Sequence, residues 1–372
     1  MNTLKNNKKL NWLPWLDGLR GFSILLVILS HFFKNTFPHE PLISWICPLG
    51  RAGVSLFFVI SGFIITSGLL AEKIKENQIS LKAFYQRRIF RIFPCAFLYL
   101  SAYWLWQFID GRPIQIKEFL AVLILAAGIW KVTTWFTGHF WSLCVEEQFY
   151  LVMPAFLQTF GVGALRKGCL FVVMMAPLLR TALYFTIGNQ LDSSIFWVLD
   201  SLAVGVFISI WYRNGHPLPR IGNGTGLLLA SIVLVAGALS FEGTYGKVTV
   251  PFGGTILAAF SAYLILLGLD EKNKGLIQGL LNYRPLIQIG KCSYSLYLFQ
   301  QLFLPPAEVV SAWWQRAPFN LVGIIVLSGI SYLFWETPWR NLGKRLASKN
   351  NRTQLFSGKL ENALIIEDKG IK

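Results

Sequence analysis

Arg20 and His31 are the first residues in the chain whose types and spacing suggest chemistry. They lie eleven positions apart in an apolar stretch. On a helix, eleven steps of about 100° fall within about 20° of three full turns, so both side chains share one face, about 16.5 Å apart along the axis. An ionisable side chain in a membrane segment is costly and often functional. Histidine commonly acts as a general base near neutral pH. The alternative role, a hydrogen bond between helices, stays open.

A second polar stripe occurs in residues 141–151 (WSLCVEEQFYL). On a helix, Ser142, Glu146 and Tyr150 fall at i, i+4 and i+8 on one face, and Glu147 points about 100° away. A carboxylate in an apolar segment needs a partner or a proton. Glu146 is therefore either a structural acid or a catalytic group that orients His31 and stabilises its charged form. We predict the catalytic role.

Arginines supply the remaining candidates. Arg88 and Arg91 lie at i and i+3 in the stretch YQRRIFRIFP, before a further apolar run. They either anchor a cytoplasmic loop or bind phosphate, because guanidinium groups bind phosphate in a bidentate manner. Arg180 and Asp200 lie on consecutive apolar segments and are interpreted as a structural ion pair. The sequence shows no metal-ligand spacing, so no metal site is predicted.

The composition defines the class of protein that positions these groups. Of 372 residues, 54% are hydrophobic and only 14% are charged, whereas soluble domains are about 25% charged. The mean hydropathy is +0.51. These values exclude a soluble globular protein and predict an all-α polytopic membrane protein. The net charge of +16 is attributed to cytoplasmic loops, and no nucleic-acid partner is expected.

Ten transmembrane helices are predicted from apolar runs of suitable length. They lie near 16–36, 49–70, 92–109, 141–160, 168–187, 195–212, 225–241, 251–269, 286–304 and 319–337. The segments that this order assigns to one side carry 25 of the 34 Lys and Arg residues. Basic residues gather in cytoplasmic loops, so both termini are predicted to be cytoplasmic.

Two segments fall outside this pattern. The region near 118–136 is apolar but short, and we predict a re-entrant or interfacial segment there. Residues 341–372 are polar and basic. They are predicted to form a cytoplasmic tail after a membrane-embedded domain at 1–340, with membrane lipids as partners of its basic groups.

Seven blocks along the chain together resemble one family. The blocks are LDGLRGFSILLVILSHF at 16–32, GVSLFFVISGFII at 53–65, RRIFRIFP at 87–94, FWSLCVEEQFYLVMP at 140–154, LDSLAVG at 199–205, SYSLYLFQ at 293–300 and WETPWR at 335–340. In type and order they are similar to the acyltransferase-3 family of membrane O-acyltransferases, of the polysaccharide O-acetyltransferase type. One residue departs from the family pattern: Gln300 stands where a histidine is frequent.

The resemblance implies an enzyme that transfers an acyl group, most often acetyl, from cytoplasmic acyl-CoA to a hydroxyl group. Acceptors would be sugars of a surface polysaccharide, a lipid-linked glycan or an exported small molecule, and the location would be a bacterial inner membrane. Acyl-CoA would be a substrate, and no permanently bound cofactor is expected. Arg20, Arg88 and Arg91 would bind the donor, and His31 would act as the base with Glu146. The alternative class is a transporter or lipid-handling membrane protein without chemistry.

Overall fold

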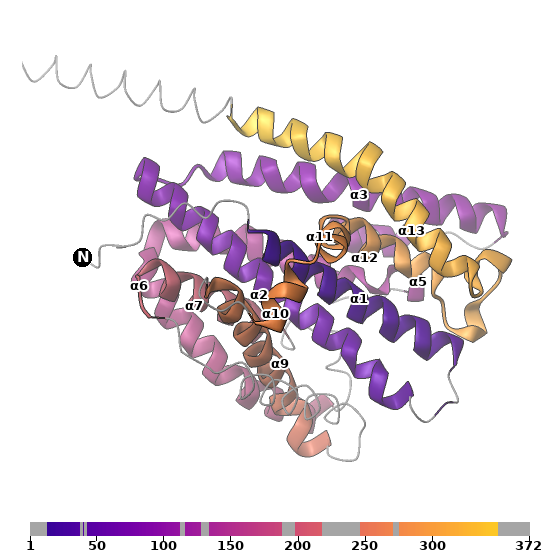
Figure 1. Cartoon of the computed structure of the whole chain (residues 1–372), viewed down its shortest axis with the longest axis horizontal. Helices are drawn as coiled ribbons and strands as arrows, with labels where there is room; N and C mark the ends of the chain where they lie inside the picture. Colours follow the sequence, from indigo (N-terminus) through magenta and orange to yellow (C-terminus); the bar gives the residue numbers. More distant parts are fainter. Residues whose placement is uncertain are drawn as a thin grey trace, which may run out of the picture.

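The computed structural model is a bundle of helices (Figure 1). It describes residues 13–37, 40, 43–111, 116–127, 134–187, 198–217, 246–270 and 275–348, and this part of the chain contains no strand. The long helices are α1 (Pro14–Thr36), α2 (Ile43–Glu76), α3 (Leu81–Ile109), α6 (Phe140–Ile187), α7 (Leu199–Arg213), α9 (Gly246–Leu269) and α13 (Phe319–Ser331). The short helices are α4 (Ile116–Leu123), α5 (Trp135–Gly138), α10 (Leu276–Leu281), α11 (Arg284–Lys291) and α12 (Ser293–Phe303). The predicted all-α class is confirmed for these residues.

Six helices in the described residues are long and apolar enough to cross a membrane. They are Pro14–Thr36, Leu49–Glu76, Leu81–Ile109, Trp135–Thr186, Pro251–Leu269 and Phe319–Ser348. The fourth contains two of the predicted spans, which are separated at Gly161, where the backbone takes φ 77° and ψ 178°. The predicted span at 225–241 lies outside the described residues. Large apolar side chains cover the outer surface, and Phe108 on α3 is 74% exposed, as expected for a lipid-facing helix.

Two glycines bring α1 and α11 into backbone contact. A Cβ added to Gly290 of α11 would lie 1.7 Å from the carbonyl oxygen of Asp17, and one added to Gly21 of α1 would lie 2.2 Å from that of Leu286. Any side chain at either position would therefore push the two helices apart. This contact fixes α11, and with it the following helix α12, along α1.

Hydrogen bonds between helices give their relative directions. His31 and Asn35, near the end of α1, bond to Gln300 and to the carbonyl oxygen of Leu304 on the α12 segment. The start of α1 packs on α11, so α1 and α12 run parallel. On the other side of the bundle, α2 and α7 are also parallel, because Ser55 pairs with Ser201 and Ser67 with Ser209.

The short apolar region near 118–136 contains α4, and the predicted tail begins within a long helix. α4 has eight residues, which give a rise of about 12 Å, too short to cross a bilayer. Its Glu118 side chain is buried and accepts hydrogen bonds from the Thr134 amide (3.2 Å) and the Thr137 hydroxyl (3.1 Å), which ties α4 to α5. At the other end of the chain, the helix that begins at Phe319 continues to Ser348, past the predicted domain boundary at residue 340. Residues 349–372 lie outside the described residues.

Replacing Gly290 by alanine tests the α1–α11 contact. Helix propensity alone favours alanine by roughly 0.5–1 kcal/mol, but overpacking costs ~1–3 kcal/mol and more where only backbone could move. We expect Gly290→Ala to lower the unfolding temperature of the detergent-solubilised protein. Gly329→Ala is the matched control, because no atom lies within 4 Å of its added Cβ. Equal stability of the two variants would contradict the contact.

Candidate active site

A small polar cavity of about 70 Å³ lies inside the bundle. Five helices supply its walls: α1, α2, α3, α6 and α12. Its lining residues are Arg20, Val54, Phe57, Phe58, Ser61, Arg91, Ser142, Leu143, Glu146, Ser293, Tyr294 and Tyr297. Four of the residues predicted from sequence, Arg20, Arg91, Ser142 and Glu146, therefore meet in one cavity although they come from three separate helices.

Glu146 is the centre of a hydroxyl cluster in this cavity. Its Oε1 accepts hydrogen bonds from the hydroxyls of Ser61 and Tyr150. The Tyr150 and Ser61 hydroxyl oxygens lie 3.1 Å apart. Within the predicted stripe on α6, Glu146 and Tyr150 are thus hydrogen-bonded to each other, and α2 adds Ser61 to the cluster. The sequence analysis missed Ser61, although a polar residue in the apolar stretch FFVISGF was a signal for it.

His31 has a different partner from the one the sequence suggested. Its Nδ1 lies 2.8 Å from Oε1 of Gln300 on α12, while the hydrogen bonds of Glu146 go to hydroxyls. The imidazole also makes an edge contact with the indole of Trp135, at 5.2 Å between ring centroids and 69° between planes. Within the described residues, Nε2 has no hydrogen-bond partner, so it is the nitrogen left open for chemistry.

The three arginines of α3, at positions 87, 88 and 91, lie in three different environments. Arg91 lines the polar cavity together with Arg20. Arg88 lies over the rings of Tyr150 (4.9 Å) and Phe84 (5.6 Å), which places it behind the hydroxyl cluster. Arg87 forms an ion pair with Glu72 on α2 at 3.4 Å. Adjacent arginines therefore differ in their access to a ligand.

Ser142 links the α6 stripe to α12. Its hydroxyl lies 2.6 Å from the Tyr297 hydroxyl and donates to the carbonyl oxygen of His139 at 3.0 Å. Tyr297 lines the cavity one helical turn before Gln300 and Gln301. The cavity and His31 therefore lie along the same pair of parallel helices, α1 and α12.

Arg180 and Asp200 form the ion pair that their positions predicted. Both side chains are fully buried, with Nη2 of Arg180 2.7 Å from Oδ2 of Asp200. Thr255 of α9 donates to the same oxygen at 2.6 Å, and Arg180 Nε donates to the carbonyl oxygen of Pro251 at 2.8 Å. The pair joins α6, α7 and α9 away from the polar cavity, which fits a structural role.

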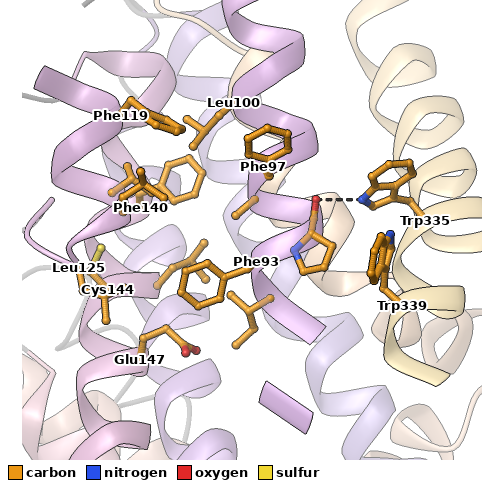
Figure 2. A pocket seen from close by; sticks show the side chains of 16 residues that line it. Phe93, Phe97, Leu100, Phe119, Leu125, Phe140, Cys144, Glu147, Trp335 and Trp339 are labelled. Atoms are coloured by element: carbon orange, nitrogen blue, oxygen red, sulfur yellow. Dashed lines mark hydrogen bonds between the residues drawn. The ribbon is translucent and has the colours of Figure 1, made fainter. Parts of the chain in front are cut away.

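A second, larger cavity of about 460 Å³ is drawn in Figure 2. Its walls are mainly phenylalanine, leucine and tryptophan side chains from α3, α4, α6 and the C-terminal helix, Phe319–Ser348. The Trp335 indole of this last helix donates to the carbonyl oxygen of Pro94 on α3 at 2.9 Å. Among the described residues that line this cavity, Glu147 is the one with a carboxyl group. Leu143 lines both cavities. An acidic group in an apolar lining disfavours phosphate, so an anionic ligand fits the smaller cavity with its two arginines.

Comparison with known families identifies the class of protein that this fold and cavity define. Residues 13–336 match the family described as acyltransferase domain. The match covers most of the chain, so the chain belongs to this acyltransferase family, as the sequence blocks predicted. No solved structure matches the chain.

Individual relatives carry more specific names. The chain is 28% identical over 373 residues to O-acetyltransferase OatA of Staphylococcus aureus, which covers 89% of this chain and 58% of that protein. It is 25% identical over 368 residues to peptidoglycan O-acetyltransferase OatA of Listeria monocytogenes, which covers 89% and 56%, respectively. The chain therefore spans a little over half the length of these relatives.

Breaking the Arg180–Asp200 pair tests its structural role. Arg180→Met leaves the Asp200 carboxylate buried without its cation, which costs about 3–5 kcal/mol. We expect a marked loss of folded protein and a lower unfolding temperature in detergent. The double variant Arg180→Met, Asp200→Leu removes both charges and should recover part of the loss. A double variant as unstable as the single one would show that packing, and not the charge pair, is responsible.

Proposed function

We propose that the chain is a membrane O-acyltransferase that moves an acetyl group from cytoplasmic acetyl-CoA to a sugar hydroxyl on the outer side. The observation that carries the proposal is the polar cavity in which Arg91 of α3 meets Arg20 of α1, because Arg20 shares a face of α1 with His31. The alternative class, a transporter without chemistry, gains no support from membership in an acyltransferase family.

The donor would bind at the arginine end of the cavity. Arg20 and Arg91 present two guanidinium groups from α1 and α3, and such groups make strong bidentate contacts with phosphate. Arg88 would add positive potential from behind Tyr150. The pantetheine arm would extend along α1, where His31 lies about 16.5 Å further on, so that its thioester reaches the imidazole.

His31 would act as the general base. Nε2 takes the proton from the acceptor hydroxyl, the hydroxyl oxygen attacks the thioester carbon, and the C–S bond breaks. The proton then passes from the imidazolium to the thiolate and gives free CoA and the ester. Glu146 would contribute through its negative charge in the cavity rather than through contact with His31.

The names of the relatives support the proposed acceptor and acyl group. The Listeria relative is named for peptidoglycan, and we extend that acceptor class, a glycan hydroxyl, to this chain. An acetyl group is proposed because the relatives are named O-acetyltransferases. A bacterial cytoplasmic membrane is the location in which acetyl-CoA and an envelope glycan lie on opposite sides.

We further propose the ten-span topology with cytoplasmic termini. α7 ends beside α2 at the Trp15 end of the bundle, with Arg213 donating to the Ser67 carbonyl oxygen. α9 begins beside the Arg180–Asp200 pair and reaches Trp15 only at Gly268. The end of α7 and the start of α9 thus lie at opposite ends of the bundle, which supports a crossing at 225–241. α1 also begins at the end where the C-terminal helix finishes (Figure 1), as an even number of spans requires.

Replacing His31 by alanine tests the proposed function. A general base contributes ~10²–10⁴-fold to the rate, so His31→Ala should reduce transfer by that factor and leave the protein folded. The measurement is release of CoA thiol from acetyl-CoA by purified protein, with and without a crude glycan extract as acceptor. Glycan-dependent release that survives in His31→Ala would overturn the assignment of the base.

The donor site is tested with Arg91→Ala. Charge-assisted hydrogen bonds contribute about 1.5–3 kcal/mol, so the KM for acetyl-CoA should rise roughly 10- to 100-fold while the acceptor KM stays unchanged. Arg88→Ala should raise it less, because Arg88 lies behind Tyr150. Arg87→Ala is the matched control, since its charge is already paired with Glu72. Equal donor affinity for the Arg91 and Arg87 variants would place the phosphates elsewhere.

A further inference from the structure

We propose that Gln300 and Gln301 act as a pair of positioning residues that fix the tautomer of His31. The pair holds the ring proton on Nδ1 and leaves the lone pair on Nε2. The value of this tautomer for catalysis rests on the proposed function, but the tautomer itself is a property of the folded protein and is measured without substrate.

Three hydrogen bonds join the imidazole to the backbone of α5. His31 Nδ1 lies 2.8 Å from Oε1 of Gln300. Nε2 of Gln300 donates to Oε1 of Gln301 at 2.8 Å, and Nε2 of Gln301 donates to the carbonyl oxygen of Trp135 at 2.6 Å. The relay therefore runs from α1 through two consecutive residues of α12 to α5.

The last acceptor fixes the direction of the whole relay. A backbone carbonyl oxygen only accepts hydrogen bonds, so Gln301 must turn its NH₂ group toward Trp135. The oxygen of Gln301 then faces Gln300, which must donate to it. The oxygen of Gln300 is left for His31, and Nδ1 must carry the proton.

Burial prevents the relay from reversing. Gln300 and Gln301 are 0% and 4% exposed, so a flipped amide would find no water to satisfy it. The Trp135 indole nitrogen donates to the Gln301 carbonyl oxygen at 3.0 Å, and the same indole ring packs against His31. Trp135 thus contacts both ends of the relay, Gln301 and His31.

The relay explains why two glutamines are needed. A carboxylate that orients a histidine has only acceptor atoms, so either of its oxygens selects the same tautomer. An amide has one acceptor and one donor, and the wrong orientation would put the proton on Nε2. The wrong tautomer in a hydrolase triad costs roughly 10⁴-fold in kcat. Gln301 is the residue that makes a neutral amide a reliable orienting group.

Nitrogen-15 NMR of histidine-labelled protein in proteoliposomes tests the proposal directly. The chain has four histidines, and His31→Gln identifies the His31 signals by their loss. At mildly alkaline pH, the wild-type protein should show His31 protonated on Nδ1 and unprotonated on Nε2. The opposite assignment would overturn the proposal whether or not the protein shows acyl transfer.

Two variants of Gln301 separate the relay from packing. Gln301→Met keeps the volume but cannot hold Gln300, so the Nε2-protonated form of His31 should appear and kcat should fall in proportion to its population, with the donor KM unchanged. Gln301→Glu should restore the wild-type tautomer and kcat, because a buried protonated carboxyl group donates to Trp135 and accepts from Gln300. A fall in kcat with an unchanged tautomer would reduce Gln301 to a packing role, and no change in either quantity would also refute the relay. If Gln301→Met fails to fold, the wild-type and Gln301→Glu spectra decide.

Discussion

The close contact between α1 and α11 is the constraint on which the rest of the structure depends. Gly21 and Gly290 leave no room for a side chain between the two backbones. α11 leads directly into α12, so this contact sets the register of α12 along α1. That register brings Tyr297 to the cavity and Gln300 to His31. The candidate site is thus assembled by a backbone contact between helices directly beside Arg20, which lines the cavity.

Two sets of charged side chains inside the bundle differ in their partners. Arg180 and Asp200 are fully buried and bond to each other and to α9, which offsets the cost of desolvating both charges. Arg20 and Arg91 instead face a cavity that they share with Glu146. A charged side chain that lines a cavity can contact a ligand. An ion pair whose hydrogen bonds all go to neighbouring helices serves to join those helices.

Consecutive residues on one helix separate the two cavities. Glu146 lines the polar cavity and Glu147 the apolar one, because successive side chains on a helix diverge by about 100°. Leu143 forms part of both linings. The charged lining therefore lies on one face of α6 and the apolar lining on the neighbouring face. This separation suits a site that binds an anionic donor within a lipid environment.

The sequence by itself determined the features that depend on one helix at a time. Composition established the helical membrane class. Periodicity placed Arg20 with His31 on one face and Ser142, Glu146 and Tyr150 on another, and span positions paired Arg180 with Asp200. Only the tertiary structure decided which faces meet: it gave His31 a glutamine partner, brought Ser61 to Glu146, and left Arg91 rather than Arg88 in the cavity. Periodicity fixes the angle of a side chain around its own axis, whereas the choice of neighbouring helix depends on packing between segments far apart in the chain.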